Sequence, residues 1–251
     1  MRFDIFVAKK LNISRNKAIE LIQNQKIICD NTTFKPSFDM KKYAKNNIFD
    51  KDFSDEELLK IFDIKLLENI YVSRAAFKLK SFIDEYKINI SNKTCLDIGA
   101  SAGGFSQVLL EYDALKVVAI DVGSDQLNPI LKQNPKLKYY ENTDIRAFKS
   151  DESFDIVLCD VSFISIEKIL FCINNFAKDL IILLFKPQFE VGKNIKRNKK
   201  GVIKNKDIIL KSKNNFEKQC QKLNWDLKIS AKSSLKGKEG NEEYFYLYSK
   251  K

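Results

Sequence analysis

The chain contains no histidine among its 251 residues. Histidine is the base in Ser-His-Asp and Cys-His nucleophile pairs, a general base on its own, and a zinc ligand. Its absence therefore excludes several hydrolytic and zinc-dependent mechanisms before any motif is considered.

Cysteine is sparse too, and no two cysteines have the Cys-x-x-Cys spacing of a zinc or redox site. The five thiols lie mainly in apolar runs, at Cys29, Cys95, Cys159, Cys172 and Cys220. We expect reduced core cysteines, no metal and a cytoplasmic location. The chain also has no stretch of about 18 consecutive apolar residues and no amino-terminal cleavage signal, so we expect neither export nor a membrane span.

Positive charge is in excess, with a formal net charge of +11. Residues 1–45 carry ten Lys and Arg against four Asp and Glu, and residues 193–213 carry nine against one. Residues 46–72 are acidic, with three against seven. A lysine-rich coding bias could raise the net charge, but it would not segregate it, so the pattern favours a polyanionic partner such as RNA.

The first basic segment resembles the S4 RNA-binding module, a small α+β fold. Phe3, Phe6, Val7 and Leu11 share one helical face, Ser14 is a plausible N-cap for a second helix, and "KIICD" reads as a short strand. The resemblance implies an RNA-binding domain over residues 1–60, followed by a linker over 61–72. The phosphate contacts it implies are Arg2, Arg15, Lys17, Lys26 and Lys35.

From residue 73 onward, apolar strands alternate with helical patterns, which predicts an α/β domain with a mostly parallel sheet covered on both faces. The predicted strands are 94–98, 116–121, 154–159, 180–185, 225–231 and 242–248, with a further strand-like run before Asp144.

The segment "LDIGASAGGF" holds three of the chain's eight glycines, directly after the first of these strands. It lacks both the Gly-x-Gly-x-x-Gly of dinucleotide folds and the Gly-Lys-Ser/Thr of phosphate-binding loops. S-adenosylmethionine fits better: Asp97 can face its ammonium, and Asp121, at the end of the next strand, can bind the ribose hydroxyls. A tight structural turn is the alternative for the glycines alone.

Four other ionisable residues fall at informative positions. Asp160 and Lys186 each follow an apolar strand, and either Glu242 or Glu243 enters the last strand. Lys78 lies on the helix before the first strand, with Phe77 and Phe82 expected to face the core.

These residues carry a specific resemblance. Lys78, Asp160, Lys186 and Glu243 occur in the order of the Lys-Asp-Lys-Glu tetrad of FtsJ-like ribose 2′-O-methyltransferases. Together with an S4-like segment, the stretches "VSRAAFKL", "CDVSFIS", "KPQFEVGK" and "GNEEYF" resemble the TlyA family, also called hemolysin A.

The resemblance implies a Rossmann-like class I S-adenosylmethionine-dependent methyltransferase domain over residues 73–251, with a seven-stranded sheet. It implies 2′-O-methylation of a cytidine in ribosomal RNA, chiefly 23S RNA of the large subunit, and a link to capreomycin susceptibility. We expect a monomer that acts on ribosomal RNA or a ribosomal subunit and needs no metal.

The site residues follow from this resemblance. The tetrad is expected to be catalytic. The cofactor is expected to lie against Asp97, Gly99, Ala100, Ser101, Gly103, Gly104, Phe105, Asp121, Val122, Asp144, Ile145 and Asp160. Further RNA contacts are expected at Arg74, Lys196, Arg197, Lys199 and Lys200.

Three alternatives remain open at this point. A catalytically inactive RNA-binding protein would have a broken tetrad, and a membrane-active hemolysin would have an export signal or a strongly amphipathic apolar helix. A small-molecule methyltransferase would leave the S4-like segment and the clustered charge unexplained.

Overall fold

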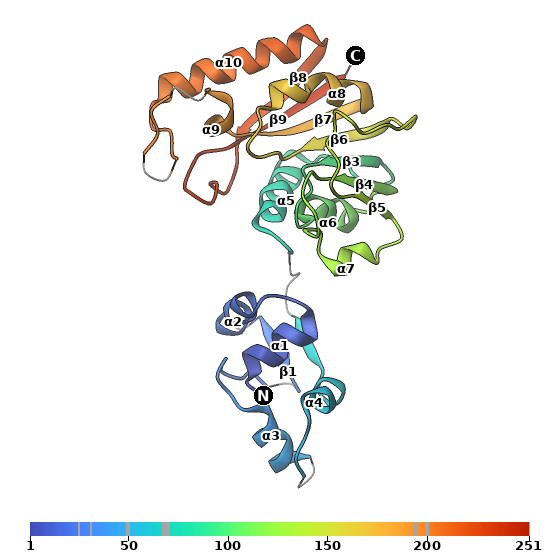
Figure 1. The fold of residues 1–251 in the computed structure, drawn as a ribbon, viewed down its shortest axis with the longest axis vertical. Coiled ribbons are helices and arrows are strands. Elements are labelled where there is room, and N and C mark those ends of the chain that lie inside the picture. Colours follow the sequence, from blue (N-terminus) through green and yellow to red (C-terminus); the bar gives the residue numbers. More distant parts are fainter. Residues whose placement is uncertain are drawn as a thin grey trace. The chain divides into compact units, whose positions relative to one another are not determined.

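A computed structural model describes residues 1–24, 26–30, 32–48, 51–66, 71–192, 195–198 and 201–250. The chain divides into two compact units, Met1–Ile70 and Tyr71–Lys251, each of which is described by itself (Figure 1).

The first unit is a small α+β fold around one aromatic-rich core. Its elements are α1 (Phe3–Leu11), α2 (Arg15–Gln23), β1 (Ile27–Cys29), α3 (Met40–Asn47), α4 (Asp55–Ile61) and β2 (Ile64–Leu66). As predicted, Phe3, Phe6 and Val7 are buried, and Ser14 caps α2 by accepting a hydrogen bond from the Lys17 backbone N–H at 3.2 Å.

Regular structure occurs within the linker predicted over residues 61–72. Its first half contains β2, which pairs antiparallel with β1 and so satisfies backbone groups that an isolated β1 would leave unpaired. At its other end, Tyr71 belongs to the second unit: its ring is buried, and its hydroxyl donates to Glu111 at 2.5 Å. Sequence pattern missed β2 because three residues are too few to show a periodicity.

The second unit has the predicted α/β architecture, with a seven-stranded sheet in the order β5-β4-β3-β6-β7-β9-β8. Its strands are β3 (Thr94–Ile98), β4 (Lys116–Ile120), β5 (Leu137–Tyr140), β6 (Phe154–Cys159), β7 (Ala177–Phe185), β8 (Trp225–Lys232) and β9 (Tyr244–Lys250). Its helices are α5 (Arg74–Tyr86), α6 (Gly104–Glu111), α7 (Pro129–Lys132), the 3-10 turn η1 (Ile166–Ile169), α8 (Leu170–Phe176), α9 (Pro187–Glu190) and α10 (Lys206–Lys222).

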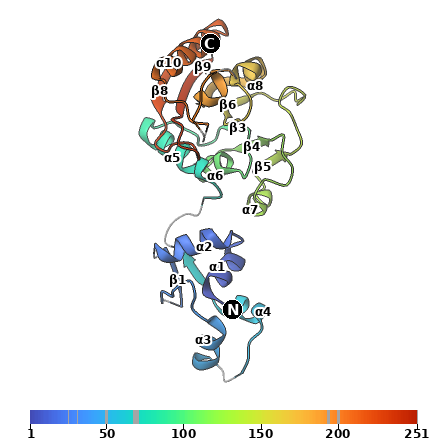
Figure 2. The same ribbon diagram turned by 60° about the vertical axis from the view of Figure 1, so that its left-hand side comes forward.

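Alternate residues of each strand enter two separate cores, because successive side chains of a strand point to opposite faces. Cys95 packs with residues of α5 and α6, whereas Leu96 and Ile98 pack with residues of α8 and α10. The two helix pairs cover opposite faces of the sheet (Figures 1 and 2).

The carboxyl ends of the parallel strands β3, β4, β6 and β7 meet at one edge of this sheet. The neighbouring strand β9 is antiparallel, so its amino end lies at the same edge, where Tyr244 pairs with Phe185. Loops from five strands therefore converge on one edge, which is where open α/β sheets bind ligands.

The turn at this edge contains glycines because neighbouring atoms leave no room for a Cβ. Gly99 has φ +82°, and a Cβ there would lie 2.8 Å from the backbone oxygen of Asp160. A Cβ at Gly104 would lie 2.0 Å from Ser73 Oγ. Packing against the β6 loop and the start of α5 accounts for both glycines without a ligand.

Gly99→Ala is expected to lower the stability of the second unit by at least about 2 kcal/mol, because it combines a left-handed backbone with a clash. Gly192→Ala is the matched control, since Gly192 has φ +83° and no atom of the described residues lies within 4 Å of a Cβ built there. Calorimetric melting temperatures should fall by several degrees more for Gly99→Ala. Equal losses would mean that the contact with Asp160 carries no cost.

Candidate active site

Lys186 and Asp160 form a nearly buried ion pair at the carboxyl edge of the sheet. Lys186 Nζ lies 2.6 Å from Asp160 Oδ1, and the two side chains are only 10% and 13% exposed. Lys186 Nζ also donates a hydrogen bond to Ser162 Oγ at 2.9 Å. Strands β7 and β6 hold the two residues in place, because each follows its strand directly and Asp160 continues the β3–β6 ladder by donating its backbone N–H to the Ile98 carbonyl.

Lys78 and Glu243 form a second buried pair. Lys78 Nζ donates to Glu243 Oε2 at 2.6 Å, with side-chain exposures of 10% and 4%. Glu242 points elsewhere and bonds the exposed Lys232 and the Tyr244 hydroxyl. The structure thus brings Glu243, and not Glu242, to Lys78.

Strand register places the two pairs next to each other. Phe185 of β7 is opposite Tyr244 of β9, so the next position along β7, Lys186, is level with the residue before Tyr244, which is Glu243. Four residues that are widely separated in sequence therefore form one cluster of two ammonium and two carboxylate groups. Each charge has a partner of opposite sign, without which its burial would cost several kcal/mol.

Phe77 corrects one expectation about this helix. It is 41% exposed instead of facing the core, and its ring contacts Tyr71. The buried face of α5 instead carries Ala76, Leu79 and Phe82 together with Lys78. The apolar pattern predicted the wrong buried face for this helix, because Lys78 occupies a buried position that the pattern assigns to the polar face.

A cavity of about 320 Å³ opens beside the Lys186–Asp160 pair. Seven of the predicted cofactor-binding residues line it, namely Gly99, Ser101, Asp121, Val122, Asp144, Ile145 and Asp160. Asp121 is fixed in place because Ser101 and Gly123 donate their backbone N–H groups to its two oxygens at 2.8 and 2.7 Å. The hydrogen bonds from Arg146 hold the pKa of Asp144 below its usual range.

Five of the predicted cofactor-binding residues do not line this cavity. These are Asp97, Ala100, Gly103, Gly104 and Phe105, all of which are buried. Asp97 is fully buried behind the turn and accepts a hydrogen bond from Ser106 Oγ at 2.6 Å. Its second oxygen, Oδ1, has no hydrogen-bond partner in the described part of the chain.

Sequence reasoning missed a carboxylate that holds the loop after Asp160. Glu190 accepts hydrogen bonds from Ser165 Oγ at 2.5 Å and from the Ile166 backbone N–H at 2.9 Å. Burial raises the pKa of Glu190 to about 6. The only signal was its place in "KPQFE", four residues after Lys186.

The same loop exposes an aromatic ring. Phe163 is 93% exposed, has φ +65° and lines the cavity, and its ring lies 5.4 Å from that of Phe189. A non-glycine residue on a left-handed backbone costs about 1 to 3 kcal/mol, and such positions cluster at functional sites.

The basic residues predicted to bind RNA differ in their surroundings. Arg2 and Arg15 both bond Asp4, and Lys17 pairs with Glu20 at 2.7 Å. Lys35 is exposed and Lys26 is half-buried.

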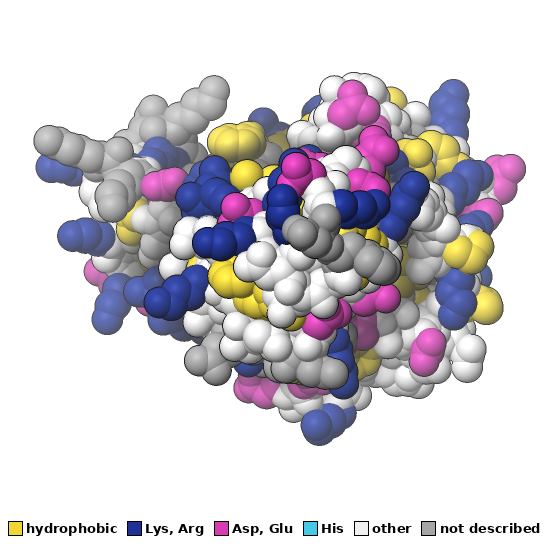
Figure 3. Space-filling view, turned by 90° about the horizontal axis from the view of Figure 1, so that it is seen from below, with side chains coloured by type: hydrophobic (Ala, Val, Ile, Leu, Met, Phe, Trp, Pro, Cys, Tyr) yellow, Lys and Arg dark blue, Asp and Glu magenta, His cyan; other side chains and the backbone are white. Residues whose placement is uncertain are grey.

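In the second unit, Arg74 donates to the Lys236 carbonyl and Lys196 is exposed. Arg197 donates to the carbonyls of Ile195, Gln188 and Gly192 and so braces its own loop. Lys199 and Lys200 lie outside the described residues. On the face seen in Figure 3, basic and acidic side chains are interleaved.

The described residues also bear on membrane and metal binding. None of the described helices is long and apolar enough to cross a bilayer. The described residues also contain no group of three or more Cys, Asp or Glu side chains that could hold a metal ion.

Comparison with known proteins gives a consistent set of relatives. The sequence profile of the FtsJ-like methyltransferase family matches residues 71–250. The 23S rRNA (cytidine-2′-O)-methyltransferase TlyA of Campylobacter jejuni is 56% identical over 252 residues, covering all of both chains. The 16S/23S rRNA (cytidine-2′-O)-methyltransferase TlyA of Mycobacterium tuberculosis is 37% identical over 71% of this chain and 68% of its own.

Among solved structures, one from Lactococcus lactis that carries the hemolysin name superposes with a TM-score of 0.69. It is 30% identical and covers 73% of this chain and 90% of its own.

The buried carboxyl of Asp97 should make the stability of the folded protein depend on pH. Burial raises its pKa to about 7 from the usual 3.8, so between about pH 4 and 7 the folded protein keeps a proton that the unfolded chain has lost. Its contribution to stability is therefore full below pH 4 and falls by roughly 1.4 kcal/mol per pH unit as the pH rises towards 7. Asp97→Asn keeps the volume and removes this dependence.

Urea unfolding of the two proteins across pH 4–8 checks the prediction. Between about pH 4 and 7, the free energy of unfolding of the wild type should fall relative to that of Asp97→Asn. Above about pH 7 the difference between the two proteins should stay constant. Parallel curves across the whole range would show that Asp97 does not titrate in this window.

Proposed function

The chain belongs to the family of FtsJ-like methyltransferases, and we propose that it methylates the ribose 2′-hydroxyl of a cytidine in 23S ribosomal RNA with S-adenosylmethionine as the methyl donor. The observation that carries the proposal is the cluster of two buried lysine–carboxylate pairs beside an acid-lined cavity. The Campylobacter jejuni enzyme of this activity is similar along its entire length. An inactive RNA-binding protein would not need to keep both pairs buried and intact.

The cavity suits the donor chemically. Two fixed acceptors in the loops after β4 and β5, Asp121 and Asp144, suit ribose hydroxyls and an adenine amino group. Asp160 at the cavity wall gives the other end a negative potential that suits an ammonium and a sulfonium group. S-adenosylmethionine supplies an electrophilic methyl carbon on its sulfonium sulfur.

The protein's own task is then to position a very weak acid. We propose that Lys186 Nζ donates a hydrogen bond to the ribose 2′-oxygen. This bond orients the oxygen so that one of its lone pairs points at the methyl carbon. Asp160 holds Lys186 in that direction through the 2.6 Å pair, assisted by Ser162. With the donor bound, the 2′-oxygen would take the methyl group from the sulfur and lose its proton to a carboxylate of the cluster, because the paired ammonium groups have no lone pair to accept it.

Lys78 and Glu243 complete the cluster. Their pair stands next to Lys186 and keeps the summed charge of the four groups at zero, so that the site can lose water around the substrate without leaving a buried charge unpaired. We assign them to holding the target ribose.

Two parts of the protein would contact the RNA substrate. The exposed Phe163 ring beside the cluster offers a face on which an unstacked RNA base can stack. We further propose that the first unit, Met1–Ile70, is an S4 module that grips RNA through Arg2, Arg15, Lys17, Lys26 and Lys35.

Lys186→Met tests the central role. It keeps an unbranched side chain one atom shorter but cannot hold the 2′-oxygen, so methyl transfer to ribosomal RNA should fall by at least about 1,000-fold, since the positioning of that oxygen is lost. Binding of S-adenosylmethionine, measured by calorimetry, should change by less than a few-fold. Loss of donor affinity in step with activity would contradict the assignment.

The same variant tests the function in cells. Mapping of 2′-O-methyl groups in ribosomal RNA, with the gene present, absent or replaced by Lys186→Met, should show one cytidine of 23S RNA that is modified only by the wild type. No difference between the three strains would refute the proposed activity.

Glu243→Gln and Glu242→Gln form a matched pair of neighbouring substitutions. Glu243→Gln leaves Lys78 buried without a counter-charge and should lower methyl transfer by about 100-fold or more. Glu242→Gln breaks only an exposed pair with Lys232, which contributes little, and should stay within about two-fold. Equal effects of the two would remove Glu243 from the site.

A further inference from the structure

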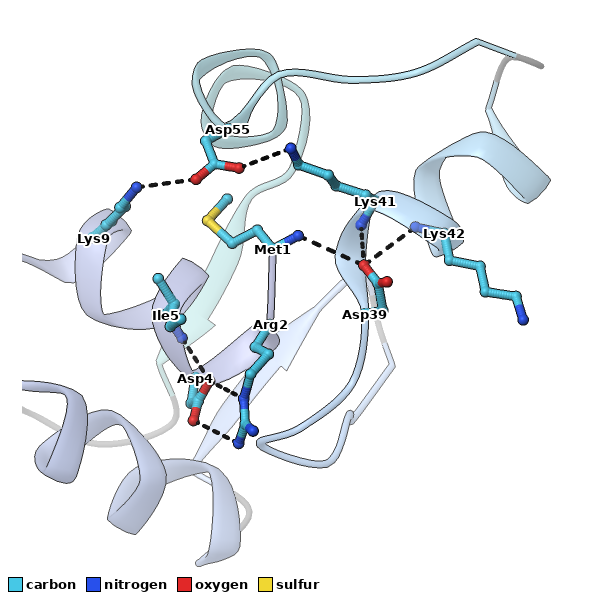
Figure 4. Close-up of polar contacts among 9 residues, drawn as sticks. All are labelled: Met1, Arg2, Asp4, Ile5, Lys9, Asp39, Lys41, Lys42 and Asp55. Atoms are coloured by element: carbon cyan, nitrogen blue, oxygen red, sulfur yellow. Dashed lines mark hydrogen bonds and ion pairs between the residues drawn. The ribbon is translucent and has the colours of Figure 1, made fainter.

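One acid of the first unit is buried beneath two arginines. Asp4, in the first turn of α1, is 0% exposed. It accepts hydrogen bonds from Nε and Nη2 of Arg2, both at 3.1 Å, and from Nε and Nη2 of Arg15, both at 3.0 Å. Its Oδ1 also accepts the backbone N–H of Ile5 at 2.9 Å (Figure 4). Two forked arginines thus share one fixed carboxylate.

This arrangement leaves a defined side of each guanidinium group available. Asp4 takes up the Nε and Nη2 edge of both groups, and in the described part of the chain neither Nη1 group has a hydrogen-bond partner. The arginine side chains are 48% and 51% exposed. Planar guanidinium groups that are held along one edge present the remaining N–H donors in a fixed direction, which suits a phosphate.

Asp4 is charged under ordinary conditions. Burial alone would raise its pKa, but the bonds from Arg2 and Arg15 outweigh burial, and the net shift of the pKa is downward. The cluster therefore carries two positive charges and one negative charge. Asp4 lowers the local positive charge, so attraction of RNA by charge alone cannot be its role.

Other acids in the same unit hold their cations loosely. Asp55 pairs with Lys9 at 3.1 Å and Lys41 at 3.3 Å, but it is 40% exposed and both lysines are about half-exposed (Figure 4). Exposed pairs between flexible side chains contribute little and fix little. Asp4 is distinguished by its burial and by its forked contacts.

We propose that Asp4 is a positioning residue, which holds Arg2 and Arg15 in the orientation that binds phosphates of the RNA backbone. This inference rests on the proposed function, since it assumes that the first unit grips ribosomal RNA. It adds that the grip depends on a rigid pair of guanidinium groups and not only on the basic charge of residues 1–45.

The test compares Asp4→Asn with wild type in the full chain, by filter binding to a 23S ribosomal RNA transcript at several salt concentrations. Asp4→Asn removes one negative charge, so a grip that depends on charge alone would tighten and its salt dependence would steepen. Positioning predicts the opposite sign: affinity about ten-fold weaker at 150 mM salt, and a log–log slope shallower by about 1 to 2.

Asp55→Asn is the matched control, because it also frees two cations by removing an acid from the first turn of a helix. It should bind RNA within about two-fold of wild type. Unchanged or tighter binding by Asp4→Asn would overturn the proposal.

Circular dichroism separates positioning from folding. Should Asp4→Asn lose helix, the double variant Arg2→Lys, Arg15→Lys decides instead, because it keeps every charge but loses the forks. It should bind about ten-fold more weakly, and wild-type affinity would overturn the proposal. Wild-type protein without affinity for the transcript would refute the proposed function of the first unit, which is a different result.

Discussion

The pairing of buried lysines with buried carboxylates is the constraint on which the second unit depends. Removing an ammonium or a carboxylate group from water costs several kcal/mol, and only a close partner of opposite charge offsets it. Lys186 and Lys78 are each 2.6 Å from such a partner. The cluster can therefore stay dry beside the cavity, where electrostatic forces on a reacting hydroxyl are stronger than in water.

Sheet register is what assembles the cluster. Asp160 and Lys186 follow the parallel strands β6 and β7, while the antiparallel β9 enters the same edge with Glu243 just ahead of it. A shift of β9 by one residue would bring Glu242 to that position and turn Glu243 to the opposite face. The glycine turn contributes from the other side, since a Cβ at Gly99 would lie 2.8 Å from the Asp160 carbonyl oxygen, and the turn after β3 therefore packs directly against the loop after β6.

Much of this arrangement could be predicted from the sequence, because apolar strands followed by acids or lysines leave a clear pattern in it. The strand ends at Asp121, Asp160 and Lys186 were found that way. The burial of Lys78 was not, since one charged residue on a helix looks like a solvated one until its partner is known. The packing role of Asp97 and the forks on Asp4 were missed for the same reason: they depend on contacts, which spacing along the chain does not reveal.

In both units, buried carboxylates hold basic side chains in fixed orientations. Asp160 fixes Lys186, Glu243 fixes Lys78, and Asp4 fixes Arg2 and Arg15. In each case the acid lowers the local positive charge of a chain whose net charge is +11, so the arrangement favours orientation over attraction. Long-range charge brings an RNA near the surface but does not choose a nucleotide or aim a hydroxyl, because it acts on every phosphate alike. Cations held in fixed orientations can set the register of a bound RNA and aim a hydroxyl, and the buried carboxylates of this protein hold such cations.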